Sequence, residues 1–177
     1  MIITISGMPG SGKSTVAKLL ATRLGYKHYS MGDLRGKMAV DRGMTINELN
    51  ELGKREDWTD REPDEYQKTL GEKEDDFVID SRLGFYFIPH SFKLLLDVDL
   101  RVADERIFKN QRPDEKPCKT VEELQNRLQE RARDDDKRFA QYYNISFQDH
   151  SKYDLLLNST NQKPDEILEQ ILAALPK

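Results

Sequence analysis

The chain has 177 residues, of which 34% are charged and 37% hydrophobic, and its formal net charge is −4 at pH 7. This length favours one domain, and the weak negative charge argues against nucleic acid or an anionic membrane as a partner. The single cysteine, Cys118, excludes an intrachain disulfide, and no apolar run approaches the ~18 residues of a membrane helix. We therefore expect a cytoplasmic enzyme or switch.

Apolar runs alternate with helical patterns along the chain. In chain order, the sequence predicts a strand at 1–6, a helix at 13–25, a strand at 27–30, helices at 33–43, 47–56 and 59–76, strands at 77–80 and 92–98, helices at 99–110 and 120–143, a strand at 153–158 and a helix at 164–175. Such alternation is typical of a five-stranded parallel sheet with helices on both faces. We predict one α/β domain over 1–177, with movable helical stretches at about 33–75 and 110–145.

Local signals support several of these boundaries. Gly25 suits a helix end, the second helix is expected to begin at Asp33, and Thr45 is the expected N-cap of the third. The apolar runs LLLDV and DLLLN are typical of strands that are buried on both faces.

Residues 7–15 read GMPGSGKST, directly after the first predicted strand. Gly7, Gly12, Lys13 and Ser14 fit the phosphate-loop pattern G-x-x-x-x-G-K-[ST]. The loop's N–H groups and the N-terminus of the next helix would face the phosphates of a nucleotide. Lys13 would reach the β- and γ-phosphates, and the Ser14 hydroxyl would ligate Mg²⁺. Because a strand precedes the loop and a helix follows it, a chance match is the weaker interpretation.

Asp80 ends the apolar strand FVID. Adjacent parallel strands bring their C-terminal ends to one crevice, so Asp80 is suited to hold a Mg²⁺-bound water or a substrate hydroxyl. The alternative is an ordinary turn residue at a strand end.

The residues around Asp80 narrow the choice of phosphate acceptor. A GTPase would carry Asn-Lys-x-Asp, whereas Asn110 and Asn161 are each followed by Gln. Asp80 is followed by Ser81 and Arg82, so no glutamate stands beside it to activate water. Arginine suits bidentate recognition of an anion, which points to a phosphorylated acceptor.

The segment RARDDDKR supplies a second group of arginines. Arg131, Asp135 and Arg138 are spaced i, i+4 and i+7, so on a helix they share one face. The carboxylate can hold both guanidiniums toward one target, where they would stabilise a migrating phosphoryl group. Taken alone, the segment also fits a solvated, charged helix.

Five segments together resemble one known family: ITISGMPGSGKSTVAKLLATRLGY, VIDSRLG, LLLDVDLRVADERI, ERARDDDKR and LLLNST. The chain resembles a nucleoside monophosphate kinase, most of all the short cytidylate kinase type. The resemblance implies a P-loop NTPase fold with a small helical NMP-binding flap and a short lid. It also implies transfer of the γ-phosphate of ATP to a nucleoside monophosphate, with CMP or dCMP as the leading acceptor and Mg²⁺ as cofactor. A monomer is the simpler expectation for an enzyme that closes by moving two flaps.

The resemblance also implies roles for individual residues. ATP binding is implied for Gly7, Pro9, Gly10, Ser11, Gly12, Lys13, Ser14, Thr15, Ser159 and Thr160. Acceptor binding is implied for Asp33, Arg35, Asp80 and Arg82. Catalysis is implied for Lys13, Arg82, Arg131 and Arg138, with Asp135 organising the lid. Ser14 would ligate the metal directly, and Asp80 through a water.

The sequence departs from the family pattern at Gly36. The family usually has an arginine there, four residues after the glycine that matches Gly32, to clamp the acceptor phosphate. Arg35 and Lys37 flank the position, but one residue is about 100° of helix, so neither points the same way. Either Arg35 takes over this role, or the acceptor differs from CMP, or turnover is poor; we expect Arg35 to take over.

The base preference of the acceptor stays open at this point. Trp58 and Tyr66 would either stack on a pyrimidine or pack on a mobile helix, and Asp60, Arg61 and Asp64 would either read the base or decorate a helix. The alternative functions are a P-loop kinase for AMP or another small metabolite, and a nucleotide-binding protein with little turnover.

Overall fold

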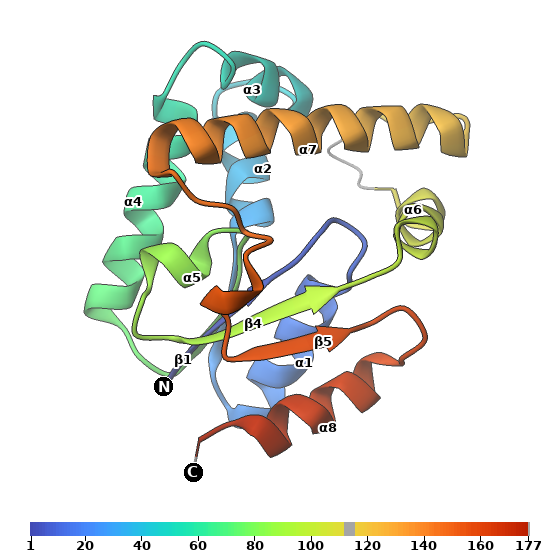
Figure 1. The fold of residues 1–177 in the computed structure, drawn as a ribbon. Coiled ribbons are helices and arrows are strands. Elements are labelled where there is room, and N and C mark those ends of the chain that lie inside the picture. The colour runs from blue at the N-terminus through green and yellow to red at the C-terminus, as the bar shows by residue number, and fades with distance from the viewer. Residues whose placement is uncertain (112–115, 177) are drawn as a thin grey trace.

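The computed structural model of the protein describes residues 1–111 and 116–176 (Figure 1). Its sheet has five parallel strands in the order β2-β3-β1-β4-β5. The strands are β1 (Ile2–Ser6), β2 (Lys27–Ser30), β3 (Phe77–Asp80), β4 (Phe92–Asp97) and β5 (Leu155–Asn158). The five-stranded parallel sheet predicted from the sequence is therefore confirmed.

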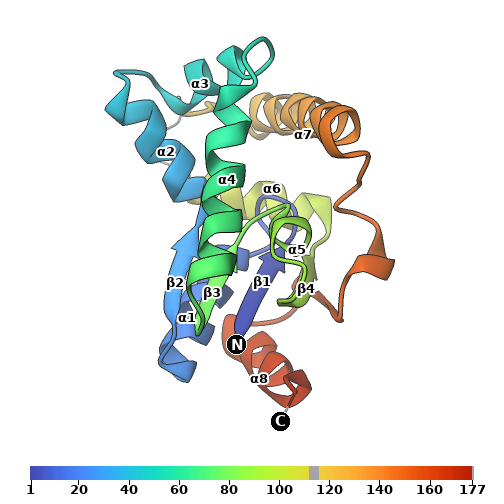
Figure 2. The same cartoon turned by 90° about the vertical axis from the view of Figure 1, so that its left-hand side faces the viewer.

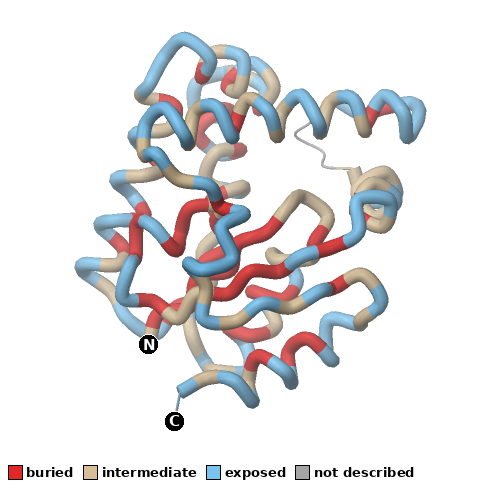
Figure 3. Tube along the Cα trace, in the orientation of Figure 1, coloured by how far each residue is buried: buried red, intermediate tan, exposed pale blue. Residues whose placement is uncertain are grey.

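Helices cover both faces of this sheet. On one face, α1 (Lys13–Leu24) and α8 (Pro164–Ala174) pack on the side chains of β1, β3 and β4 that point toward them. On the other face, α4 (Trp58–Lys73) and α5 (Gly84–Phe87) cover β1 and β3. β1 and β3 are accordingly buried along their length (Figure 3). None of the helices within the described ranges is long and apolar enough to cross a membrane.

The remaining helices lie above the C-terminal ends of the strands. They are α2 (Met31–Asp41), α3 (Ile46–Leu52), α6 (Leu100–Lys109) and α7 (Val121–Tyr143). The short 3₁₀ helix η1 (His150–Lys152) instead lies directly before the start of β5. Figure 2 shows α2, α3 and the upper part of α4 on one side and α7, seen along its axis, on the other. The predicted movable stretch at 110–145 includes residues 112–115, which lie outside the described residues.

Several predicted boundaries are confirmed, and one is wrong. Gly25 ends α1 in the left-handed conformation (φ 70°), and Thr45 forms a capping box with Glu48 at the start of α3. The second helix begins at Met31 rather than at Asp33. The hydroxyl of Ser30, the last residue of β2, accepts a hydrogen bond from the Asp33 N–H and caps the helix two residues earlier.

The prediction that both apolar runs are buried on two faces holds for β4 but not for β5. Leu94, Leu95 and Leu96 are buried, whereas Leu156 is 47% exposed. β5 is the edge strand, so its alternate side chains meet the α1 and α8 face on one side only. The sequence analysis also missed α5, which has only four residues.

Candidate active site

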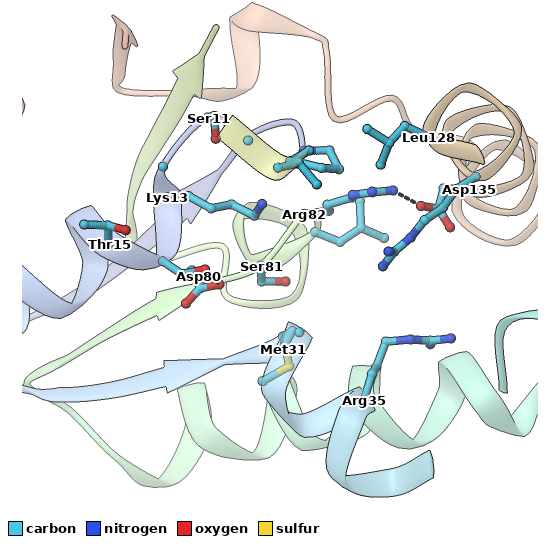
Figure 4. A pocket seen from close by; sticks show the side chains of 18 of the residues that line it. Ser11, Lys13, Thr15, Met31, Arg35, Asp80, Ser81, Arg82, Leu128 and Asp135 are labelled. Carbon is cyan, nitrogen blue, oxygen red and sulfur yellow. Dashed lines mark hydrogen bonds and ion pairs between the residues drawn. The ribbon is translucent and has the colours of Figure 1, made fainter. Parts of the chain in front are cut away.

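A cavity of about 760 Å³ opens above the C-terminal ends of the strands, lined by the phosphate loop, by α2, α4 and α6, and by α7 (Figure 4). Most of the site residues predicted from the sequence line it. They are Pro9, Gly10, Ser11, Gly12, Lys13, Ser14, Thr15, Arg35, Asp80, Arg82, Arg131, Asp135, Arg138 and Ser159. One cavity thus gathers residues from five separate parts of the chain.

Three predicted site residues do not line the cavity. Gly7 lies behind the phosphate loop, where a Cβ atom would come within 2.3 Å of the carbonyl oxygen of Leu96. Asp33 is exposed on α2. The Thr160 hydroxyl accepts a hydrogen bond from the Asp99 N–H at 2.8 Å and so ties two loops together.

The phosphate loop has the backbone that its glycines permit. Gly10 and Gly12 adopt φ values of 80° and 87°, which other residues rarely reach. Gly10 also packs against α6, because a Cβ atom there would lie 2.7 to 2.8 Å from Ala103. The Lys13 ammonium donates to the Met8 carbonyl at 3.4 Å across the loop. The glycines and the Lys13 contact thus set the shape of the loop, which leads into the N-terminus of α1, a position that favours anions.

Asp80 is the centre of a group of polar side chains at the edge of the cavity. It is 3% exposed, and its Oδ1 accepts hydrogen bonds from the hydroxyls of Ser14 at 2.9 Å and Ser30 at 3.2 Å. The His28 Nε2 lies 2.9 Å from Asp80 Oδ2. The sequence analysis missed His28 and Ser30, because it gave no strand order and so did not set β2 beside β3.

This group fits a magnesium ion. Mg²⁺ prefers oxygen ligands and is usually bound by one or two protein groups together with substrate phosphates and waters. The hydroxyl of Ser14 and the carboxylate of Asp80 supply such oxygens beside the phosphate loop. Within the described ranges there is no cluster of three or more His, Cys, Asp or Glu that would form a metal cage of protein ligands alone.

Asp135 connects Arg82 with the arginines of α7, which the sequence analysis identified as two separate groups. Its buried carboxylate forms ion pairs with Arg138, one turn away on α7, and with Arg82, which follows β3 in the core. Figure 4 shows Arg82 and Asp135 pointing toward each other across the cavity. Burial, together with repulsion from Arg131 and Arg138, lowers the pKa of Arg82 to about 9. Arg82 is still a cation at neutral pH, and it needs an anion beside it.

A second carboxylate, Asp60 on α4, contacts Arg35 and also Arg138. Arg35 donates to Asp60 Oδ1 at 2.9 Å and to the Thr59 carbonyl at 2.8 Å, and Arg138 Nε lies 3.4 Å from Asp60 Oδ2. Burial lowers the pKa of Arg35. Of the two residues that flank Gly36, Arg35 lines the cavity and Lys37 is exposed.

Asp64, one turn after Asp60 on α4, also lines the cavity. Its Oδ2 accepts a hydrogen bond from the hydroxyl of Tyr143 at the end of α7. Burial raises the pKa of Asp64 to about 6, which outweighs the opposing effects of Tyr143, Arg35 and Lys68. An ionised Asp64 therefore costs the folded state free energy.

The opposite end of the cavity contains an arginine that the sequence analysis missed. Arg106, in the last turn of α6, donates to Gly10 O at 3.3 Å, to Ser159 Oγ at 3.1 Å and to Ser159 O at 2.8 Å. It fastens the phosphate loop to the segment before α8. A cation near a helix C-terminus is common, so its position alone gave no signal.

The two aromatic candidates, Trp58 and Tyr66, do not line the cavity. Trp58 packs against the buried cluster of α2 and α3, with the guanidinium of Arg42 4.6 Å from its ring. Tyr66 contacts Tyr29 edge to face. Both therefore have a packing role in this structure.

The sheet order, the phosphate loop and the arginine-lined cavity together define a P-loop kinase fold. The cytidylate kinase-like family matches residues 2–161, and the chain belongs to this family. It is 42% identical to a cytidylate kinase of Natronomonas pharaonis over 99% of this chain and 89% of that protein. It is 35% identical to a cytidylate kinase of Archaeoglobus fulgidus over 99% of this chain and 94% of that protein.

Solved structures support the fold. A shikimate kinase from Bacteroides thetaiotaomicron superimposes with a TM-score of 0.69 at 17% identity, over 99% of each chain. An uncharacterized protein from Eubacterium ventriosum gives a TM-score of 0.70 at 18% identity, over 98% of this chain and 96% of that one.

The raised pKa of Asp64 gives a test of stability. The Asp64 carboxyl stays protonated to a higher pH in the folded state than in the unfolded chain. Its ionisation therefore lowers the free energy of unfolding progressively as the pH rises from about 4 to 6, and the loss stays constant above that. Asp64→Asn should therefore raise the free energy of unfolding at pH 7.5 by roughly 1–3 kcal/mol and change it little at pH 4. Thermal unfolding followed by circular dichroism at both pH values measures this difference.

Asp60→Asn is the matched control, since it changes the same group one turn away on α4. It removes a partner of the buried Arg35 and Arg138 and should lower the stability at pH 7.5. A loss of stability in Asp64→Asn at pH 7.5 would contradict our assignment of burial as the dominant influence on Asp64.

Proposed function

We propose that this protein transfers the γ-phosphate of ATP to CMP, which gives CDP and ADP. The observation that carries the proposal is the meeting of Lys13 of the phosphate loop with Arg82, Arg131 and Arg138 at one cavity. Membership of the cytidylate kinase-like family and full-length relatives named cytidylate kinase support CMP as the acceptor. Transfer is reversible, because the phosphoanhydride bond that breaks resembles the one that forms.

The phosphate loop and its neighbours bind ATP. The loop's N–H groups hold the phosphates, Lys13 neutralises the β- and γ-phosphates, and the adenosine extends toward the Arg106 and Ser159 end of the cavity. Ser14 and Asp80 would hold Mg²⁺, which supplies positive charge to the phosphate oxygens when it is bound.

Arginines bind the phosphate of the acceptor and stabilise the group in transit. Arg82 and Arg35 approach it from the core and from α2, and Arg131 and Arg138 approach it from α7. During transfer, negative charge spreads over the oxygens of the migrating group, and arginines already fixed around it stabilise that charge without reorganisation. α7 closes the cavity and keeps out water, the competing acceptor.

Asp135 controls when these arginines are available. In the free protein its carboxylate neutralises Arg82 and Arg138. The phosphate of the acceptor presents the same kind of oxygen fork, so it can replace the carboxylate on both arginines. Asp135 thereby keeps the arginines oriented before the substrate arrives.

A panel of acceptors tests the proposed function and its alternatives. With ATP and Mg²⁺, release of ADP should be fastest with CMP or dCMP and slower with UMP, AMP or GMP. If AMP is turned over faster than CMP, the protein is a different small-molecule kinase and the proposal is wrong. If none of the five acceptors is turned over, the protein is a nucleotide-binding protein with little turnover. The measurement is a coupled ADP assay at saturating ATP.

The lid arginines give a second test. Because Arg131 and Arg138 are proposed to act on the migrating group, Arg131→Ala and Arg138→Ala should each lower kcat and kcat/KM together, by about a hundredfold or more. Asp135→Asn should lower them less, because it loosens the arginines without removing one. Steady-state kinetics, with ATP affinity measured in parallel, checks this.

The control is Arg133→Ala, which removes an exposed arginine from the same helix and should leave the rates near wild type. If the Arg131 and Arg138 variants also keep near-normal rates, RARDDDKR is only a charged surface.

A further inference from the structure

One wall of the cavity has no role in the handling of phosphate. It is formed by Met31 at the start of α2, by Pro63, Asp64 and Gln67 of α4, and by Ser81 after β3. The wall contains no cation, unlike the wall around Arg82 and Arg138. In Figure 4, Met31 and Ser81 lie on the α2 side of Arg82. A nucleotide whose phosphate contacts Arg82 would extend its base along this wall.

The wall combines apolar surface with two polar groups at helical spacing. Asp64 and Gln67 are three residues apart on α4, so they are neighbours on the same face. Met31 and the buried Pro63 flank them with apolar surface. A planar base with apolar faces and one polar edge fits such a slot.

A hydrogen bond from Ser81 fixes the orientation of the Gln67 side chain. Its side chain is 3% exposed, and its Oε1 accepts a hydrogen bond from the hydroxyl of Ser81. Because the amide oxygen faces Ser81, the amide nitrogen with its two N–H groups is directed to another side.

The two carboxylates of this face have different partners. Asp60 is engaged by Arg35 and Arg138. Asp64 binds the Tyr143 hydroxyl through Oδ2, and a carboxylate has further acceptor sites on its second oxygen. At pH 7.5, above its pKa of about 6, Asp64 is ionised and can only accept hydrogen bonds.

On the basis of the proposed function, we propose that Asp64 and Gln67 read the base of the acceptor. Asp64 accepts a hydrogen bond from the N4 amine of cytosine, and the Gln67 amide nitrogen donates to N3. Uracil has the opposite pattern at these two atoms, an acceptor at O4 and a donor at N3–H. With uracil, the Asp64 carboxylate would face the acceptor O4, and the Gln67 N–H would face the donor N3–H. Both contacts would be repulsive, so Asp64 and Gln67 favour CMP over UMP.

The free-energy cost of ionising Asp64 in the folded state agrees with a role in base recognition. Its ionised form costs the fold stability, and the neutral isostere Asn would avoid that cost. Groups whose charge is kept at the expense of stability, in a cavity, are commonly functional.

The test compares CMP with UMP in the variants Asp64→Asn and Gln67→Glu. An Asn presents an N–H donor to O4 of uracil, and a Glu presents an acceptor to its N3–H. Each variant should lower the ratio of kcat/KM for CMP to that for UMP by at least about tenfold, while the KM for ATP stays within about twofold. Glu65→Gln, an exposed carboxylate on the same helix, is the matched control and should keep the wild-type ratio.

A substrate analogue separates recognition from a merely structural role. The monophosphate of pyrimidin-2-one riboside keeps N3 of cytosine but lacks the N4 amine. Loss of the amine should cost the wild-type enzyme about tenfold or more in kcat/KM and cost Asp64→Asn almost nothing. If both proteins lose activity equally, Asp64 does not contact the amine and the inference is wrong.

The same data distinguish this inference from the proposed function. Wild-type turnover of CMP with an unchanged CMP to UMP ratio in both variants would overturn only the base-reading role. A wild-type protein that prefers AMP to CMP would contradict the proposed function, and the reading of cytosine with it.

Discussion

The site depends on one buried carboxylate. Asp135 lies between Arg82 of the core and Arg138 of α7, in surroundings where burial, together with Arg131 and Arg138, lowers the pKa of Arg82. Cations that are buried together repel one another strongly unless an anion stands among them. The closed position of α7 is therefore stable only with a negative group at this point: the carboxylate in the free protein and, in our proposal, a phosphate in the complex. The same charge balance that closes the cavity prepares it for phosphoryl transfer.

Other ion pairs also connect α7 with α2, α4 and the segment between α3 and α4. Asp60 connects Arg35 with Arg138, so α2, α4 and α7 share one charge network around the cavity. Lys54, between α3 and α4, pairs with Glu130 and Asp134 of α7, but it is partly exposed, and pairs of that kind contribute about 1 kcal/mol or less. A substrate that enters between α4 and α7 would consequently contact both of the stretches that we predict to be movable.

The sequence predicted what is contiguous or periodic, and missed what depends on strand order. The phosphate loop lies within nine residues, and the helical spacing of Arg131, Asp135 and Arg138 is local, so both could be read directly. That Arg82 would pair with Asp135 follows only from the position of α7 above β3, which no local pattern encodes. Likewise, His28 meets Asp80 because β2 and β3 are neighbours, and Leu156 is exposed because β5 is an edge strand. Arg106 was missed because most of its partners are backbone carbonyls, which have no sequence signature.

The claim that Asp135 holds the lid closed can be measured without catalysis. Spin labels at Lys137→Cys on α7 and Glu169→Cys on α8, both exposed, in a Cys118→Ser background, report the distance between lid and core by double electron–electron resonance. The free protein with Asp135 should give one short, narrow distance distribution. Asp135→Ala should give a longer and broader one, and ATP with CMP should shorten it again as phosphate replaces the carboxylate. Identical distributions for the free proteins with and without Asp135 would contradict the account.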